Sequence, residues 1–271
     1  MDAEHTMALA DGRVLGWAEL GAADADLVVV HHHGTPSSRL ELAAFDETLR
    51  EMGVRVIAPD RPGYGTSSPR RDGRSVADWV SDLTALLEAL GIARFATSGY
   101  SGGAPHAVAV AASEAWHDAV AHVVLIAGVM EGVATPGEEP MWALARELDF
   151  DAFEAAFGGE SMPDLAPADL AALGEADFGA AMMATLVEGA AQGQAGAAGD
   201  EYAYAHPWGV AHGAVTQPID LWQGDADTIV PIDHLDLLAT TYPQAQVHRV
   251  PAHGHISIAT LLPDILRPLV P

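Results

Sequence analysis

The sequence predicts an α/β fold with a mostly parallel central sheet of about eight strands, an antiparallel N-terminal edge and helices on both faces. Short apolar runs alternate with helical patterns along most of the 271 residues. The runs are almost continuously hydrophobic, as expected of strands that are covered on both faces. Residues 130–212 contain helical patterns alone, which indicates a helical cap inserted into a core domain of residues 1–129 and 213–271.

The first predicted element is a β-hairpin at the edge of the sheet. In MALADGRVLGWAEL, residues 7–20, an Asp-Gly turn separates two alternating segments. The other predicted strands are 27–33, 54–60, 94–100, 120–128, 218–224 and 245–251, and the clearest core helices are 39–52, 76–90 and 103–116. Within the cap, the Gly- and Ala-rich segment 189–199 is interpreted as either a mobile connection or an ordinary surface loop.

The chain is strongly acidic, with 38 acidic and 12 basic residues and a formal net charge of −26. Such a charge repels nucleic acid and anionic membranes, so neither is an expected partner. All basic residues are arginine, which excludes Schiff-base chemistry on lysine, and the lack of cysteine excludes disulfides and thiolate metal sites. The N-terminal residues carry no apolar leader and no run is long enough to span a membrane, so a cytoplasmic location is expected.

The stretch GYSGG, residues 99–103, falls where a predicted strand passes into a predicted helix. A sharp turn of this kind strains the residue at its apex and brings the residues two before and two after it close together. Ser101 occupies the apex, and Gly99 and Gly103 occupy the crowded positions, where only small residues fit. The pattern therefore indicates a nucleophile elbow that exposes the Ser101 hydroxyl.

A nucleophilic serine needs a base, and the base needs an acid to orient it. His255 lies in the loop after the last predicted strand, and His253 is the competing base. Asp225 and Asp227 directly follow the strand predicted at 218–224. The order serine, aspartate, histidine along the chain is the one that a hydrolase built on an α/β sheet requires.

Over essentially its whole length the chain resembles the α/β-hydrolase fold superfamily, in its serine hydrolase branch with a helical cap. The matching stretches are HHHGTPSSR, DRPGYGTSS, GYSGG, GDADTIVP and AHGH. The resemblance implies that Ser101 is the nucleophile, Asp227 the acid and His255 the base. Asp225 is then expected to serve its loop, and Glu131, after the preceding strand, is the alternative acid.

The resemblance further implies that the backbone amides of Thr35 and Gly102 bind the oxyanion, with Gly34 letting the chain approach the site closely. Four residues are predicted to contact substrate, namely Gly34, Tyr100, Trp142 and Met183. Other cap side chains could either roof a pocket or fill the cap's own core, namely Met141, Phe150, Phe153, Met182, His206 and Trp208.

The run HHH at residues 31–33 predicts no metal site. Adjacent residues on a strand point to opposite faces, so at most His31 and His33 could share a ligand, and no carboxylate cluster accompanies them. His33 is expected to pack and hydrogen-bond within its loop. In DRPGYG, Asp60 and Arg61 are expected to brace the loop, and Tyr64 is predicted to be structural rather than part of a pocket.

The predicted reaction is hydrolysis of an ester or lactone of a small, largely apolar substrate through an acyl-enzyme, without a cofactor. A proline-iminopeptidase-like enzyme and a carbon–carbon bond hydrolase are alternatives on the same triad. In the first, acidic cap residues would hold a substrate ammonium, and the candidates are Glu138, Glu139, Glu147 and Glu154. A receptor-like protein that binds a small molecule is an alternative of a different class. The oligomeric state is left open.

Overall fold

The structure, a computed structural model, describes residues 2–70, 73–158 and 164–269. In these residues eight strands form one sheet in the order β1-β2-β4-β3-β5-β6-β7-β8. They are β1 (Asp2–Ala8), β2 (Val14–Gly21), β3 (Leu27–His32), β4 (Val54–Pro59), β5 (Phe95–Tyr100), β6 (Val120–Ile126), β7 (Ile219–Gly224) and β8 (Gln246–Val250). β2 pairs antiparallel with β1 and β4, and every other pairing is parallel. The predicted sheet with its antiparallel N-terminal edge is confirmed.

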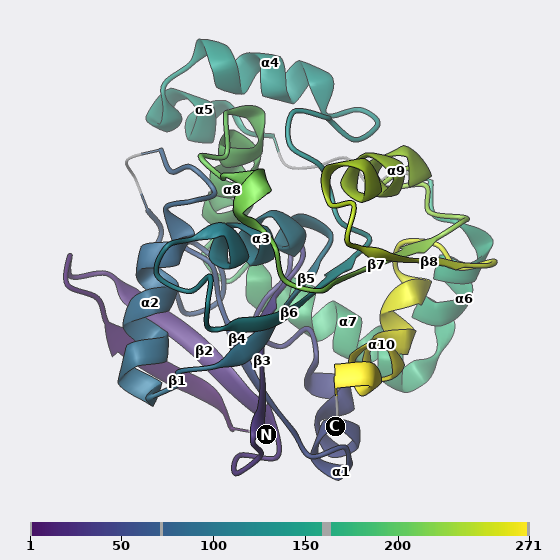
Figure 1. Cartoon of the computed structure of the whole chain (residues 1–271). Coiled ribbons are helices and arrows are strands. Elements are labelled where there is room, and N and C mark those ends of the chain that lie inside the picture. The colour runs from purple at the N-terminus through teal and green to yellow at the C-terminus, as the bar shows by residue number, and fades with distance from the viewer. Residues whose placement is uncertain (1, 71–72, 159–163, 270–271) are drawn as a thin grey trace.

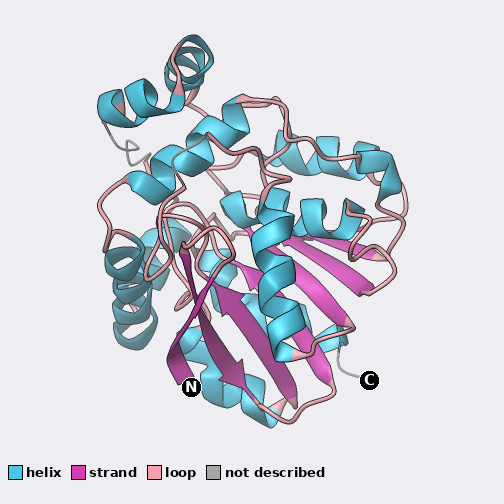
Figure 2. Cartoon of the chain, turned by 90° about the vertical axis from the view of Figure 1, so that its left-hand side faces the viewer, coloured by secondary structure: helices cyan, strands magenta, loops and turns pink. Residues whose placement is uncertain are grey.

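Helices cover both faces of the sheet (Figures 1 and 2). The helices of the described residues are α1 (Asp46–Glu51), α2 (Trp79–Leu90), α3 (Ala104–Ala112), α4 (Glu139–Glu147), α5 (Phe150–Ala156), α6 (Pro167–Gly174), α7 (Ala176–Gly189), α8 (Ala195–Ala205), α9 (Ile232–Thr241) and α10 (Leu262–Leu266). On one face Leu83 of α2, Val108 of α3 and Leu235 of α9 share a buried apolar cluster with the strands. On the other face Leu49 of α1 and Ile265 of α10 do the same. This double cover explains why the inner strands read as unbroken apolar runs.

The five helices α4–α8 lie between β6 and β7, and the described part of this segment holds no strand. α4, α5 and α8 share an apolar cluster that includes Trp142, Phe153 and Tyr204. α4 and α5 lie at the end of the molecule farthest from both termini (Figures 1 and 2). α6 and α7 instead pack against the core, α6 beside the turn Ser257–Leu261 and α7 beside the turn Ala43–Phe45.

The sheet order places a ligand site at the ends of β3 and β5. β3 lies between β4 and β5, so the chain leaves β3 toward one side of the sheet and leaves β5 toward the other. In parallel α/β sheets the crevice at such a switch point binds ligands, just beyond the carboxyl ends of the strands. Ser101 follows β5 directly, and the loop of residues 33–38 follows β3.

All three predicted core helices are shorter than expected, and two of them differ most. The helix predicted at 39–52 begins at Asp46, after a turn of 3-10 helix, because the Arg39 amide donates to Asp60 (2.7 Å) and holds the preceding residues in a loop. The helix predicted at 103–116 ends at Ala112. Ser113 adopts an extended backbone there, and its hydroxyl donates to the carbonyl of Val110 (2.8 Å).

The interpretation of 189–199 as a mobile connection or surface loop fits residues 190–194, a largely exposed turn, and is wrong for residues 195–199. α7 ends at Gly189, and α8 begins at Ala195 and is largely buried. A Cβ on Gly196 would lie 2.7 Å from the Tyr64 ring, and a Cβ on Gly189 would lie 2.3 Å from the carbonyl oxygen of Ser37. The glycines and alanines here allow helices to approach the core closely. Composition alone suggests flexibility for the same residues.

Candidate active site

Ser101 lies at a strained turn between β5 and the 3-10 turn Ser101–Gly103 that opens α3. Its φ is +52°, a left-handed conformation that is costly for a residue with a side chain. A Cβ on Gly99 would lie 2.5 Å from the carbonyl oxygen of Gly103, and one on Gly103 would lie 2.0 Å from that of His32. The crowding expected from the GYSGG pattern is therefore present, and the glycines are required by contact with backbone atoms.

The structure brings Ser101, His255 and Asp227 into one chain of hydrogen bonds. Nε2 of His255 is 2.9 Å from Oγ of Ser101, and Nδ1 of His255 is 2.8 Å from Oδ2 of Asp227. A carboxylate accepts hydrogen bonds, so Nδ1 of His255 carries the ring hydrogen and donates a hydrogen bond to Asp227. Nε2 is then free to accept from the Ser101 hydroxyl. All three side chains are buried or nearly so, with Ser101 8% exposed.

Asp227 is fixed by the backbone that follows β7. Its Oδ1 accepts from the amides of Ile229 (2.9 Å) and Val230 (2.8 Å), and its Oδ2 accepts from the Gln223 side chain (2.6 Å) as well as from His255. Burial alone would lower the pKa of His255. The Asp227 carboxylate and its hydrogen bond outweigh that effect and raise the pKa of His255 above its ordinary value.

The competing candidates lie elsewhere. The Asp225 carboxylate accepts from the amide of Ala252 (2.7 Å) in the neighbouring loop. The half-buried His253 contacts the carbonyl oxygen of Pro251 (2.9 Å) through Nδ1. Glu131 accepts from the amide of Trp208 (2.7 Å) and is also bound to His212 (2.6 Å). None of these groups contacts the Ser101 or His255 side chains in the structure.

Thr35 and Gly102 lie side by side next to Ser101. A Cβ on Gly102 would come within 2.4 Å of the Thr35 hydroxyl, so the loop after β3 and the start of α3 are in contact. Gly34 is held on both sides: its amide donates to Glu41 (2.9 Å), and its carbonyl accepts from the Arg61 guanidinium (3.0 Å). The loop that carries Thr35 is thus fixed by buried hydrogen bonds before any substrate arrives.

A cavity of about 490 Å³ opens above these groups. The predicted residues that line it are Gly34, Thr35, Tyr100, Ser101, Met183 and His255. Apolar side chains form most of the remaining wall, among them Phe157, Leu173, Met182, Leu186, Ile229 and Ile256. Most of these come from α7 and from the ends of the other helices of the β6–β7 segment. The helical segment therefore supplies much of the cavity wall.

The structure does not bring Trp142 to this cavity. The indole is 2% exposed, packs in the cluster shared by α4, α5 and α8, and donates to Glu201 (2.9 Å). Of the other cap residues, Met182 lines the cavity, whereas Phe153 and Trp208 belong to the same apolar cluster as Trp142. The apolar pattern of an inserted helix does not reveal which of its faces borders a cavity. Trp142 lies inside the helical segment instead.

The histidines at residues 31–33 each have protein partners. His31 is bound to Ser98 (2.8 Å) and Glu41 (2.7 Å), and His33 contacts the carbonyl oxygen of Gly34 (2.7 Å) and accepts from the Arg61 amide (3.2 Å). Burial lowers the pKa of His33, so it stays neutral. Within residues 2–70, 73–158 and 164–269, no three His, Asp or Glu side chains gather as a metal site.

A buried cluster of charges around Asp200 of α8 was not predicted from the sequence. Asp200 is fully buried and is paired with Arg61 (2.6 Å) and with Arg74. Its Oδ2 also accepts from the hydroxyls of Thr35 (2.7 Å) and Tyr64 (2.8 Å). Burial would raise the pKa of Asp200, but the two arginines hold it well below its ordinary value. Arg61 thus ties its loop to the loop after β3 and to the helical segment, whereas Asp60 braces the loop itself as predicted by accepting from the Thr66 amide (3.0 Å).

Tyr64 is structural, as predicted, and it also lines the cavity. Its hydroxyl is bound to Asp200 and its ring packs against Gly196. A second missed residue is Asp169 of α6, which contacts the loop that carries His255. No motif marks Asp169 or Asp200, and the burial of an aspartate within a helix has no signal in a single sequence.

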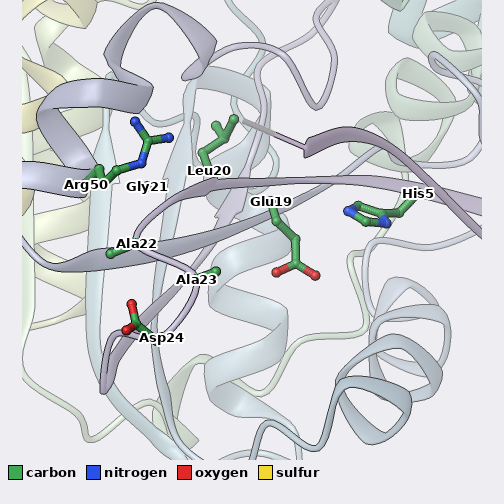
Figure 3. Close-up of a pocket in the computed structure, with 8 residues that line it drawn as sticks. All are labelled: His5, Glu19, Leu20, Gly21, Ala22, Ala23, Asp24 and Arg50. Atoms are coloured by element: carbon green, nitrogen blue, oxygen red, sulfur yellow. The ribbon is translucent and has the colours of Figure 1, made fainter.

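A larger hollow of about 570 Å³ lies at the opposite end of the strands (Figure 3). Its lining residues are His5, Glu19, Leu20, Gly21, Ala22, Ala23, Asp24 and Arg50. Gly21 pairs with Arg55 near the start of β4, so this hollow is at the end of the sheet where the parallel strands begin. Its side chains come from separate elements and do not converge on one point in Figure 3. Size alone therefore does not identify a site.

No single helix of the described chain has the length and apolarity needed to cross a membrane. α6 and α7 reach the required length and composition only as a pair, with a bend of 97° between them. Both helices carry side chains that contact the core or line the cavity, as Asp169 and Met182 do.

The comparisons with known proteins agree on one family. The model of the family described as alpha/beta hydrolase fold matches residues 28–260. A bifunctional esterase/perhydrolase of Acinetobacter calcoaceticus is 34% identical over 119 residues, 44% of this chain and 42% of that protein. A non-heme chloroperoxidase of Streptomyces lividans is 34% identical over 152 residues, 56% of this chain and 53% of that protein. The chain thus spans about half the length, or less, of these curated relatives.

Solved structures extend the likeness of fold to the whole chain. A thermophilic esterase from Thermogutta terrifontis superposes with a TM-score of 0.74 at 21% identity and covers 100% of both chains. The enol-lactonase from Burkholderia xenovorans LB400 superposes with a TM-score of 0.72 at 19% identity, covering 97% of this chain and 99% of its own. At this level of identity the superpositions establish the fold.

Proposed function

The chain belongs to the alpha/beta hydrolase fold family, and we propose that it is a serine-dependent hydrolase that cleaves an ester or lactone of a small, largely apolar substrate. One observation carries the proposal: the unbroken hydrogen-bond chain from Ser101 through His255 to Asp227, at the floor of an apolar cavity. The curated relative named as an esterase/perhydrolase and the structures named as an esterase and an enol-lactonase support acyl chemistry.

In the proposed reaction Oγ of Ser101 attacks the substrate carbonyl carbon while Nε2 of His255 takes its proton. The oxygen of the resulting tetrahedral intermediate is held by the amides of Thr35 and Gly102. His255 then protonates the leaving alcohol, and an acyl-enzyme remains on Ser101. Water, deprotonated by the same histidine, releases the acid. Asp227 keeps the imidazole in the required tautomer and stabilises its cation.

The cavity favours neutral esters over the amino-terminal substrates of an iminopeptidase. Among the described residues that line it, Glu41 is the one acid, and both its oxygens are bound, to the Gly34 amide and to His31. The four cap glutamates that could have held an ammonium are not part of the lining. An apolar wall with few polar groups is suited to an acyl chain. The helical segment serves in this proposal as the cap that encloses the substrate.

The proposed steps use the chain's own groups and water. That no cofactor is needed and that the protein is cytoplasmic both stay predictions. A carbon–carbon bond hydrolase would share every group named above. It would differ in the substrate alone, so it is decided by assay and not by the geometry of the triad.

The test is hydrolysis of p-nitrophenyl esters from acetate to octanoate by the wild type, by Ser101→Ala and by Ser81→Ala, whose serine is exposed on α2. We expect Ser101→Ala to lose about 10⁴- to 10⁶-fold in kcat and Ser81→Ala to match the wild type. A wild-type burst of about one p-nitrophenol per chain would report the acyl-enzyme. Absence of turnover, or equal turnover by Ser101→Ala, would overturn the proposal. Tight ligand binding without turnover would instead support the receptor-like alternative.

A further inference from the structure

Asp169 reaches from the helical segment to the loop that carries His255. It lies in the first turn of α6 and is fully buried. Its Oδ1 accepts from the amide of Ser257 (2.7 Å) and from the Ser257 hydroxyl (2.8 Å). The oxygen of that hydroxyl in turn accepts from the Gly254 amide (2.8 Å). One carboxylate therefore fixes the residue directly before His255 and the residue two positions after it.

The second oxygen of Asp169 has no such partner. Oδ2 is buried, and no group in the described part of the chain forms a hydrogen bond with it. It lies so close to the loop that a Cβ on Gly254 would be 2.4 Å away, and glycine at 254 makes this approach possible. A buried carboxylate oxygen without a partner costs free energy. Buried polar groups without a partner are often found at functional sites.

The position of Asp169 gives its charge a role at the base. His255 becomes a cation when it takes the proton of Ser101, and a buried negative charge close to the imidazole stabilises that cation. Asp227, Asp169 and Glu41 all raise the pKa of His255, in that order, against the lowering effect of burial. Asp227 acts through a direct hydrogen bond, whereas Asp169 contacts only the backbone and the serine of the loop.

We propose that Asp169 is a positioning residue for His255, through which the helical segment anchors the loop of the base and stabilises the imidazolium formed in the reaction. The role of His255 as base rests on the proposed function. Asp169 itself takes up no proton: the proton of Ser101 moves to Nε2 of His255 and then to the leaving group. Because Asp169 belongs to α6, one carboxylate joins this helix to the loop of the base.

The first test is an NMR titration of the His255 imidazole in the wild type, Asp169→Asn and Asp177→Asn. Asparagine retains an oxygen that can accept from Ser257 but removes the charge. Asp177 is the matched control, because it lies in the first turn of α7 and is exposed. The groups that face His255, namely Ser101, Tyr100, Glu41 and Asp227, are unchanged in both variants.

We expect a lower pKa for His255 in Asp169→Asn than in the wild type, and the wild-type pKa in Asp177→Asn. Equal His255 pKa values in all three proteins would overturn the inference. The titration needs no turnover, so it decides the inference even if the proposed esterase activity fails. That activity is decided separately by the wild type and Ser101→Ala.

The second test separates anchoring from charge by kinetics on the preferred p-nitrophenyl ester. Asp169→Ala removes the anchor of the loop, and we expect kcat to fall about 100-fold because the base is displaced. KM should change by less than about threefold, since Asp169 does not line the cavity. Asp169→Asn should restore most of kcat. A loss that appears in KM, or a folded Asp169→Ala with wild-type kcat, would contradict a positioning role.

Discussion

The sheet and the helical segment between β6 and β7 hold their parts of the site in different ways. On the sheet side, Ser101 and Asp227 directly follow β5 and β7, so strand pairing and short loops fix them. The described part of the helical segment has no strand pairing to fix it. Its ties to the core include two fully buried aspartates, Asp169 on α6 and Asp200 on α8, which reach into the loops that carry His255 and Thr35.

Strand register fixes the position of a strand in a sheet, and buried charge can fix the position of an inserted helix in a similar way. A buried carboxylate is costly without partners, and few positions offer them, so we expect each aspartate to favour one way of docking its helix. Asp200 joins Arg61, Arg74 and the Thr35 hydroxyl, and thereby links α8 to the loop after β3. Apolar contacts alone would tolerate a sliding helix far better. The following variants test how strongly the two regions differ.

The largest effect is expected on the sheet side, from Asp227→Asn. The amide would present a donor to Nδ1 of His255 and favour the wrong tautomer, so kcat for ester hydrolysis should fall by about 10⁴-fold. Asp225→Asn, two residues away and bound only to a loop amide, should stay within about threefold of the wild type. A comparable loss in both variants would show that the loop as a whole, rather than the Asp227 carboxylate, matters.

The next effect is expected in the helical segment, from Asp200→Ala. Removing this carboxylate leaves Arg61 and Arg74 buried without their counter-ion, and we expect about 3–5 kcal/mol less free energy of unfolding. Urea unfolding measures this loss. Asp177→Ala, at an exposed position of α7, should cost less than about 1 kcal/mol. A small loss in Asp200→Ala would mean that apolar packing holds α8 in place.

A pair of glycine substitutions compares the two regions with the same change of side chain. A Cβ on Gly103 would lie 2.0 Å from a backbone oxygen, so Gly103→Ala should lower the free energy of unfolding by about 1–3 kcal/mol or more. Around Gly174, at the end of α6, nothing lies within 4 Å of an added Cβ. Gly174→Ala should therefore leave the melting temperature nearly unchanged. Similar losses at both positions would refute the contrast.

The smallest effect concerns substrate choice. Met183→Ala removes part of the cavity wall, so preference among p-nitrophenyl esters should shift a few-fold toward longer acyl chains. Trp142→Phe, inside the helical segment, should leave that preference unchanged. It should lower the free energy of unfolding by about 1 kcal/mol through the lost hydrogen bond to Glu201. A shift in chain-length preference in Trp142→Phe would show that α4 governs the cavity.

The predictions from sequence were accurate where local chemistry decides the outcome. The strands at 27–33, 54–60 and 218–224 match β3, β4 and β7 within about one residue. The GYSGG stretch predicted a strained turn, and Ser101 adopts it. They were inaccurate for Trp142 and for the segment 189–199. In a helical insertion rich in alanine and glycine, several faces are similar in composition, and local pattern cannot say which one meets the core.

What the sequence determined by itself was the sheet, the elbow and the order of the three side chains that now share one hydrogen-bond chain. These follow from the spacing of apolar residues, from the spacing of glycines in GYSGG, and from the position of polar residues just after strands. Each of these signals extends over only a few residues. Only the tertiary structure decided that Asp169 and Asp200 are buried beside the site and that Trp142 is not. Those outcomes depend on contacts such as Thr35 with Asp200, across 165 residues of chain. Pairings at that distance are settled when the whole chain packs, because a buried charge finds its partner only in the assembled fold.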